Sequence, residues 1–374
     1  MTATTAPAPK KPTNGPSGRP GARREGLLAW FMAGPALFLL AIFLIAPFLL
    51  GFWLGLTDQR LISPNPAEFV GLDNYKELLS LEVLTLDAVV DETGAVVVDE
   101  DGNTVYPSLR DFTRDEENYP QYHRMQEWMQ WNIGESRIIL LARDVVFMKA
   151  LVNTLIFALL IVPLQGGLGL LLALLINKRI RGVNIFRTIY FVPVVMSMVV
   201  VALLWRFMYG ADDGLINSML GTVTLGAMEP VDWLGNTDTA LGAILVTSVW
   251  QGVGFHMVIW LAGLQTIPYV LYEAAQIDGA GRWGQFRNVT IPGLRNTIVF
   301  VVIVITIQAF GLFVQVNEMT RGGPLDATQS VIFQAVQRGY EKSDIAMGST
   351  ISVVFFALVL IVSLFQRFLM RDKS

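Results

Sequence analysis

Residues 150–177 have the sequence ALVNTLIFALLIVPLQGGLGLLLALLIN, in which no side chain is charged. An α-helix rises 1.5 Å per residue, so about 20 apolar residues cross the hydrocarbon layer of a bilayer. This stretch exceeds that length. Hydrophobic residues make up 53% of the 374-residue chain and charged residues only 16%. The chain therefore has the composition of a membrane protein rather than of a soluble domain.

Five further charge-free stretches flank this one, and each reaches the length of a membrane span or comes close to it. The six stretches are residues 27–56, 150–177, 188–205, 239–272, 296–317 and 345–366. Arg187 and Arg206 bound the shortest stretch, and their long side chains reach the interface from such positions. We predict an all-α polytopic membrane protein with about six transmembrane helices. Residues 150–374 form its core domain with five of them, and a small mixed α/β extracytoplasmic insertion lies between spans one and two.

The basic residues of the flanks indicate the orientation, because cytoplasmic flanks carry an excess of Lys and Arg. Those at the predicted cytoplasmic ends are Lys10, Lys11, Arg19, Arg23, Arg24, Lys178, Arg179, Arg181, Arg282, Arg287, Arg295, Arg367, Arg371 and Lys373. Residues 207–238 contain acidic residues and no Lys or Arg. We therefore expect both termini in the cytoplasm and the chain in the cell (inner) membrane. Residues 1–26 are predicted to be a disordered basic tail, and residues 27–56 a retained anchor rather than a cleaved signal peptide.

The predicted insertion, residues 57–149, holds 18 of the 31 acidic residues of the chain. Residues 88–98 are typical of two short strands around a turn that contains Gly94. Asp99, Asp101 and Asn103 occupy the first ligand positions of a calcium loop, but Thr104 and Arg110 stand where such a loop needs Gly and Glu, so a hairpin turn is the better interpretation. A helix at the membrane interface is expected further on, with Met125, Trp128, Met129 and Trp131 as its apolar residues.

Several classes of chemistry are disfavoured by the residues available. The chain has no Cys and only two His. Thiolate catalysis is therefore impossible, and a histidine metal site or a catalytic triad is disfavoured. It has no Gly-x-x-x-x-Gly-Lys-Ser/Thr loop to hold ATP phosphates. No Asp or Glu lies in the six stretches, which disfavours a secondary transporter coupled to protons or sodium. We therefore predict that the chain is not an enzyme, has no cofactor or metal site, and binds no nucleic acid.

The connection after the fourth span has an unusual sequence, EAAQIDGAGR at residues 273–282, followed by VTIP at residues 289–292. Small residues let a short helix approach another surface closely. Gly279 and Gly281 permit a sharp turn, and Pro292 suits the first turn of the next helix. The segment is predicted to present a short helix to a partner beneath the membrane.

This segment resembles the membrane subunits of binding-protein-dependent ATP-binding-cassette importers. Their motif is Glu-Ala-Ala, three residues, Gly, nine residues, Ile, one residue, Leu-Pro, and the spacing is matched here with Val289 for Ile and Ile291 for Leu. The resemblance implies that residues 269–293 are the coupling loop, with Glu273, Ala274, Ala275, Asp278 and Gly279 facing an ATPase. It also implies a second related permease, two ATPase subunits that hold ATP and magnesium, an external sugar-binding protein and a surrounding lipid bilayer.

Other segments resemble the maltose-type sugar permeases in particular, among them residues 69–75, 153–157, 187–193, 261–268 and 319–324. The resemblance places the substrate pathway at Trp250, Gly252 and Phe255 in the fourth span and at Gln308 and Leu312 in the fifth. Leu312 stands where the maltose case has an amide, so the sugar is left open. The function expected is the permease subunit of a carbohydrate importer. An importer of another solute remains an alternative. For the polar residues of the fourth and fifth spans, the alternative role is to join neighbouring helices only.

Overall fold

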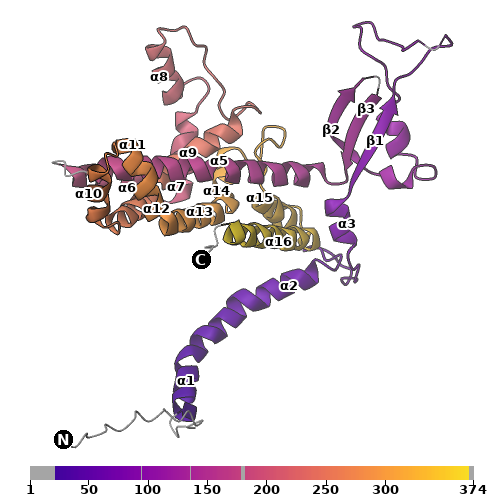
Figure 1. The fold of residues 1–374 in the computed structure, drawn as a ribbon. Helices are drawn as coiled ribbons and strands as arrows, with labels where there is room; N and C mark the ends of the chain where they lie inside the picture. Colours follow the sequence, from indigo (N-terminus) through magenta and orange to yellow (C-terminus); the bar gives the residue numbers. More distant parts are fainter. Residues whose placement is uncertain (1–21, 94, 135, 178–181, 370–374) are drawn as a thin grey trace, which may run out of the picture. The chain divides into compact units, whose positions relative to one another are not determined.

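The computed structural model describes residues 22–93, 95–134, 136–177 and 182–369. The described chain is mostly helical and includes a small three-stranded sheet (Figure 1). It divides between Leu50 and Gly51 into two units. Most of the predicted basic tail, residues 1–21, lies outside the described residues, as do the basic turn at residues 178–181 and the last five residues.

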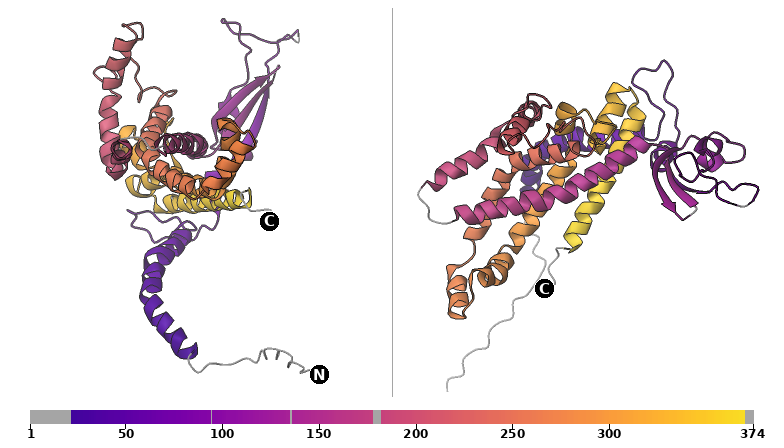
Figure 2. Two further views of the ribbon diagram at one scale, coloured as in Figure 1. Left: turned by 60° about the vertical axis from the view of Figure 1, so that its left-hand side comes forward. Right: turned by 90° about the horizontal axis from the view of Figure 1, so that it is seen from above.

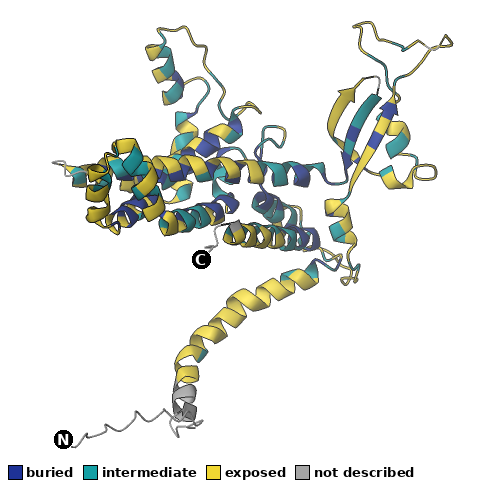
Figure 3. Cartoon of the chain, in the orientation of Figure 1, coloured by how far each residue is buried: buried dark blue, intermediate teal, exposed yellow. Residues whose placement is uncertain are grey.

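The first unit contains α1 (Ala22–Leu40), the π-helical segment η1 (Ala41–Ile45) and the start of α2 (Ala46–Leu54). Helix α1 begins five residues before the predicted first span. The stretch Ala29–Leu54 is long and apolar enough to cross a membrane, and none of its side chains is buried within the protein. Figure 3 shows this helical stretch as exposed along almost its whole length. Such a surface is stable in contact with lipid and not with water.

The segment between α2 and α5 folds as a small α/β unit. Its elements are α3 (Asp73–Leu79), β1 (Leu81–Asp87), α4 (Leu109–Thr113), η2 (Pro120–Tyr122), β2 (Gln126–Ile133) and β3 (Ser136–Ala142). The strands are antiparallel in the order β1-β3-β2, with Leu84 opposite Ile139 and Gln130 opposite Ile139 on the other side. One face of the sheet is covered by α4 and its neighbours, and a compact cluster is buried there: Leu84, Leu86, Met125, Ile139 and Leu141.

Two expectations for this segment have different outcomes. The turn at residues 99–103 forms: the Asp99 backbone N–H donates to the Asn103 carbonyl at 2.9 Å, and the Asp99 carboxylate accepts the backbone N–H groups of Asp101 and Asn103. The interface helix at Trp128 and Trp131 is wrong, because these residues lie in strand β2. Pairing with β3 decided the conformation there, since β-propensity of aromatic residues is realised when a partner strand is available.

The membrane core begins with the long helix α5 (Val145–Ile176), five residues before the predicted span. Figure 2 shows the other helices of the bundle running beside it, with the sheet beyond its N-terminal end and α10 and α11 toward its C-terminal end. The remaining elements are α6 (Val183–Val195), α7 (Met198–Met208), α8 (Leu215–Val223), α9 (Ala240–Gln265), α10 (Tyr269–Ile277), α11 (Arg282–Gln285), η3 (Phe286–Thr290), α12 (Ile291–Gly293), α13 (Arg295–Phe310), α14 (Val314–Met319), α15 (Val331–Val336), η4 (Gln337–Glu341) and α16 (Ile345–Leu369).

Four helical stretches of the described chain are long and apolar enough to cross a membrane, and the number rises to six if each of two bent pairs counts as one span. The first bent pair is α6 and α7, which meet at 100°. The second joins Arg282–Gly293 to α13 at 69°. The third predicted span, residues 188–205, is therefore a broken helix. The helix is interrupted at Met196 and Ser197, where the backbone is extended.

Helices α5 and α9 share the largest packing surface of the core, and α13 packs against both. Close approach depends on small residues, as is usual between membrane helices. At Gly254 of α9, a β-carbon would overlap the carbonyl oxygen of Tyr190 in α6. The main buried cluster, which includes Phe157, Met257 and Ile305, lies where these helices meet. The apolar side chains on the outer faces of α5 and α16 are exposed.

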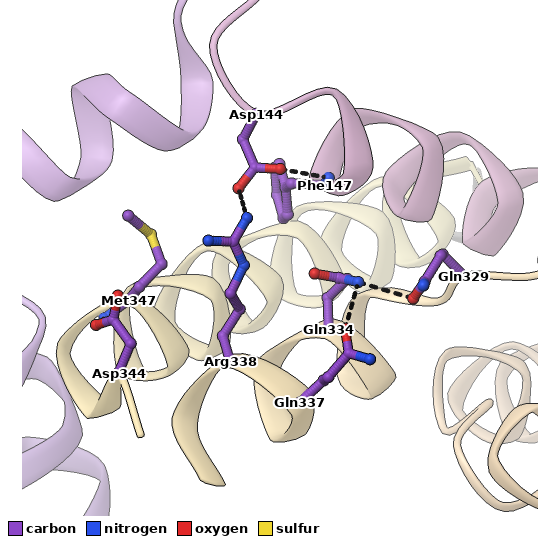
Figure 4. A network of polar contacts seen from close by, with 8 residues as sticks. All are labelled: Asp144, Phe147, Gln329, Gln334, Gln337, Arg338, Asp344 and Met347. Atoms are coloured by element: carbon purple, nitrogen blue, oxygen red, sulfur yellow. Dashed lines mark hydrogen bonds and ion pairs between the residues drawn. The ribbon is translucent and has the colours of Figure 1, made fainter. Parts of the chain in front are cut away.

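A partly buried ion pair connects the start of α5 to the segment before α16 (Figure 4). Asp144 is the N-cap of α5, where one carboxylate oxygen accepts the backbone N–H of Phe147 at 2.9 Å. Its other oxygen accepts Arg338 Nη2 at 2.6 Å. Nearby, the Gln334 amide donates to Gln329 Oε1 at 2.8 Å. These contacts connect the start of α5 to η4 and stabilise the adjoining α15.

Candidate functional site

The predicted coupling residues form one short exposed helix. Glu273, Ala274 and Ala275 lie in α10, Asp278 is its C-cap, and Gly279 follows with φ +76°. The Gly279 N–H donates to the Gln276 carbonyl at 3.0 Å, and the Ala280 N–H to the Ala275 carbonyl at 2.8 Å. These two bonds are the Schellman motif, which needs a left-handed residue at the position that Gly279 occupies. The sequence therefore ends the helix at a fixed point and turns the chain sharply.

The outer surface of this helix combines charge with exposed apolar side chains. Glu273 is exposed, and Tyr269, Val270 and Ile277 are 70%, 62% and 86% exposed. The Tyr272 hydroxyl lies 3.0 Å from the Thr290 hydroxyl and connects α10 to η3. Apolar side chains at this exposure, next to a charge on a rigid short helix, suit contact with another protein.

A cavity of about 440 Å³ lies within the helical core. It is open at one side and lies between α5, the α6–α7 break, α9 and the α13–α14 break. The residues that line it are Phe157, Ile161, Gln165, Val194, Met198, Ser248, Gln251, Gly252, Phe255, Gln308, Ala309, Gly311, Val314 and Gln315. Its volume lies within the range of about 300–1,000 Å³ that small-molecule sites occupy.

The lining of this cavity is polar without being charged. Its hydrogen-bonding side chains are four glutamines and one serine, and none of the described residues around it is Asp, Glu, Lys or Arg. Gln315 Nε2 donates to Ser248 Oγ at 3.4 Å, which connects α14 to α9. Aromatic carbon is present at Phe157 and Phe255. Amides hydrogen-bond hydroxyl groups, and an aromatic face packs on C–H surface, so the lining suits an uncharged polyhydroxylated solute.

The structure brings three of the five predicted pathway residues together. Gly252, Phe255 and Gln308 line the cavity. Trp250 is outside the lining and packs edge-on against Trp205 of α7, with ring centroids 5.6 Å apart. Leu312 is also outside the lining, buried at the α13–α14 break, where its carbonyl oxygen accepts the Ser330 hydroxyl.

Sequence reasoning missed the contribution of α5. Gln165 lines the cavity from this helix, opposite Ser248 and Gly252 of α9. A signal for it was present, because Gln165 interrupts a long apolar stretch and a polar group inside a span marks a path or a helix contact. The described part of the chain contains no cluster of three or more His, Cys, Asp or Glu side chains placed to hold a metal ion.

The profile of one protein family, the binding-protein-dependent transport system inner membrane component, matches residues 165–374. This range includes α10, the α9 and α13 walls of the cavity, and Gln165 itself. The chain belongs to this family. The resemblance predicted from the Glu273–Pro292 spacing is thus confirmed, and the chain is a multi-pass component of the inner membrane.

Two curated relatives are sugar permeases by name. The trehalose/maltose transport system permease protein MalF of Thermococcus litoralis is 30% identical over 338 residues, which cover 90% of this chain and 91% of that protein. The lactose transport system permease protein LacF of Rhizobium radiobacter is 33% identical over 245 residues, which cover 64% of this chain and 82% of that protein.

Two solved structures share the fold. A chain of a bacterial ABC transporter involved in import of the acidic polysaccharide alginate aligns with a TM-score of 0.65 at 19% identity, over 94% of this chain and 97% of that chain. A chain of the bacterial alginate transporter in complex with a periplasmic protein bound to alginate pentasaccharide aligns with a TM-score of 0.56 at 24% identity, over 61% and 79%. At these identities the similarity shows the fold alone.

Proposed function

We propose that this family member is the permease subunit of an ATP-driven importer for an uncharged carbohydrate. The observation that carries the proposal is the cavity lined by four glutamines, a serine and two phenylalanines, with no charged side chain among the described residues around it. A sugar offers many hydroxyl groups and apolar C–H faces, which match amides and aromatic rings. The names of the relatives, which carry trehalose, maltose or lactose, support the same class of solute.

The topology proposed has about six spans with both termini in the cytoplasm. Each bent pair then counts as one span, and the residue 57–149 insertion stands outside the membrane between spans one and two. Residues 27–56 are the first span and residues 150–374 the core domain. The sheet and α10 lie toward opposite ends of α5, which supports placing them on opposite sides of the bilayer (Figure 1).

Energy enters, in this proposal, through residues 269–293. Glu273, Ala274, Ala275, Asp278 and Gly279 lie on or just after α10, whose exposed apolar side chains fit a groove on an ATPase subunit. ATP and magnesium belong to that partner. The assembly proposed contains a second related permease, two ATPase subunits and an external sugar-binding protein. The substrate pathway of this half is Gly252, Phe255 and Gln308, with Trp250 and Leu312 beside it.

The test is sugar-dependent ATP hydrolysis by the importer, purified through a tag on this chain and reconstituted in liposomes with its binding protein. A panel of neutral sugars (maltose, trehalose and lactose among them) and acidic oligosaccharides is added in turn. We expect stimulation by at least one neutral sugar and none by acidic ones. Stimulation by acidic oligosaccharides alone, or by no sugar, would contradict the proposal.

A further inference from the structure

Gln165 occupies an unusual position for a polar side chain. It lies in the middle of α5, is only 3% exposed, and donates from Nε2 to the carbonyl oxygen of Ser248 in α9 at 3.2 Å. In an α-helix that carbonyl already accepts the N–H group four residues on, which belongs to Gly252. A carbonyl oxygen has two lone pairs, so the Gln165 amide uses the second.

Gly252 is what makes this second bond possible. A β-carbon at residue 252 would overlap the Nε2 atom of Gln165 and lie 3.0 Å from its Cδ atom. A side chain there would collide with the Gln165 amide and displace it. The Gln165 amide therefore lies in a notch that the missing side chain of Gly252 leaves in α9. The two residues are 87 positions apart in the chain and act as one unit at the cavity wall.

The amide oxygen of Gln165 faces a different situation from its nitrogen. Within the described residues, no hydrogen bond reaches Gln165 Oε1, and this atom is not sealed from the cavity that the residue lines. An amide oxygen accepts two hydrogen bonds, and a buried acceptor without a partner costs free energy. Because Nε2 is fixed by Ser248, the planar amide group holds Oε1 in one direction. Gln165 Oε1 is therefore a preoriented acceptor for a donor in the cavity.

We propose that Gln165 Oε1 accepts a hydrogen bond from a hydroxyl group of the transported sugar, so that α5 forms a third wall of the pathway beside α9 and α13. The inference rests on the proposed function, because a hydroxyl group is the donor that a neutral sugar brings. The amide that accepts this bond is uncharged, and so are the other side chains of the cavity lining. Gly252 then acts as a positioning residue, because it sets the depth and direction of the amide.

The rival explanation is that Gln165 only joins α5 to α9, as polar residues often do between membrane helices. The two explanations differ in one measurable respect. A residue that only joins helices affects all solutes alike. A residue that accepts one sugar hydroxyl loses its effect when that hydroxyl is absent, as in a double-mutant cycle between protein and ligand.

The experiment uses the complete importer in liposomes and compares Gln165→Met with the unsubstituted chain. Met has a similar length and flexibility and cannot hydrogen-bond in this way. KM for uptake is measured for a transported neutral sugar and for its set of monodeoxy analogues. The preference of the binding protein cancels, because both arms use the same binding protein. A net hydrogen bond of about 1 kcal/mol corresponds to an increase in KM of about fivefold for the parent sugar. For the analogue that lacks the bonded hydroxyl group, Gln165→Met and the unsubstituted chain are expected to have the same KM.

Gln366→Met is the matched control. Gln366 Nε2 donates to Thr306 Oγ1 at 2.7 Å and joins α16 to α13 away from the cavity lining. Gln366→Met is expected to leave the ratio of KM between the parent sugar and each deoxy analogue unchanged. If Gln165→Met does not assemble, Gln165→Asn, which withdraws the amide by one methylene, takes its place.

An equal change of KM for the parent and every deoxy analogue would overturn the inference while leaving the proposed function intact. Failure of the unsubstituted importer to transport any neutral sugar of the panel would overturn both.

Discussion

Helix α10, which we propose as the contact with the ATPase, and the cavity are built in opposite ways. Helix α10 is exposed, and the bonds that end it join residues only three to five positions apart. The cavity is enclosed by helices whose contacts join distant positions, such as Gln165 to Ser248 and Gln315 to Ser248. Substitutions in α10 should therefore disturb a partner contact and spare the fold. Substitutions around the cavity and its supporting junctions should alter both the transport of the solute and the stability of the protein.

The largest expected effect is at the turn after α10. Gly279→Val forces a β-branched residue into the left-handed conformation, which disfavours the Schellman turn and redirects the chain. We expect the protein to remain in the membrane while sugar-stimulated ATP hydrolysis of the reconstituted importer falls more than tenfold. Gly281→Ala is the control, because Gly281 has φ −68° and no atom would lie within 4 Å of an added β-carbon. Equal loss in both variants would show that the turn geometry does not matter.

The second effect concerns stability at the interior junction. Arg338→Met leaves the Asp144 carboxylate, which is 8% exposed, without its charged partner. Breaking a fully buried pair in this way costs about 3–5 kcal/mol, and the cost here is smaller because the Arg338 side chain is 26% exposed. The midpoint of thermal unfolding of the detergent-solubilised protein is expected to drop by several degrees. Lys76→Met removes an ion pair with Asp73 in which both side chains are about 70% exposed, and should change little. A similar midpoint for both variants would mean that the junction adds nothing to the fold.

A smaller effect is expected within the cavity. Gln308→Ala removes an amide from the lining, and the loss of one net hydrogen bond of about 1 kcal/mol should raise KM for the sugar about fivefold. Ser352→Ala serves as the control, because its hydroxyl bonds to the Gly348 carbonyl of its own helix at 2.8 Å. Uptake kinetics of Gln308→Ala that match the unsubstituted importer would remove Gln308 from the pathway.

The smallest effect is a pH dependence in the turn at residues 99–103. Hydrogen bonds, led by the backbone N–H of Asn103, hold the pKa of the exposed Asp99 carboxyl below its usual range. This contribution to the turn is present above the unfolded pKa of about 3.9 and is lost as pH falls through the folded value. Hydrogen exchange at the Asn103 amide, corrected for the intrinsic pH dependence, should therefore lose protection in acid. Asp99→Asn should abolish that pH response, and a retained response would assign it to another group.

The sequence by itself determined what depends on nearby residues. The apolar runs fixed the membrane class, since the bilayer has a constant thickness. The spacing from Glu273 to Pro292 identified the family. Asp99 with Asn103 fixed a turn, because the hydrogen bonds that close this turn join residues only a few positions apart.

Tertiary structure decided what depends on partners far along the chain. Trp131 lies in a strand because Ile138 of β3 pairs with it, and Trp128 lies at the bulge of the same strand. Gln308 lines the cavity while Trp250 does not, and Gln165 reaches it only because Gly252 leaves space in α9. A hydrophobic span carries few polar residues, so its sequence does not show which face is turned toward a cavity. The face that meets the cavity is therefore chosen by the side chains of the neighbouring helices.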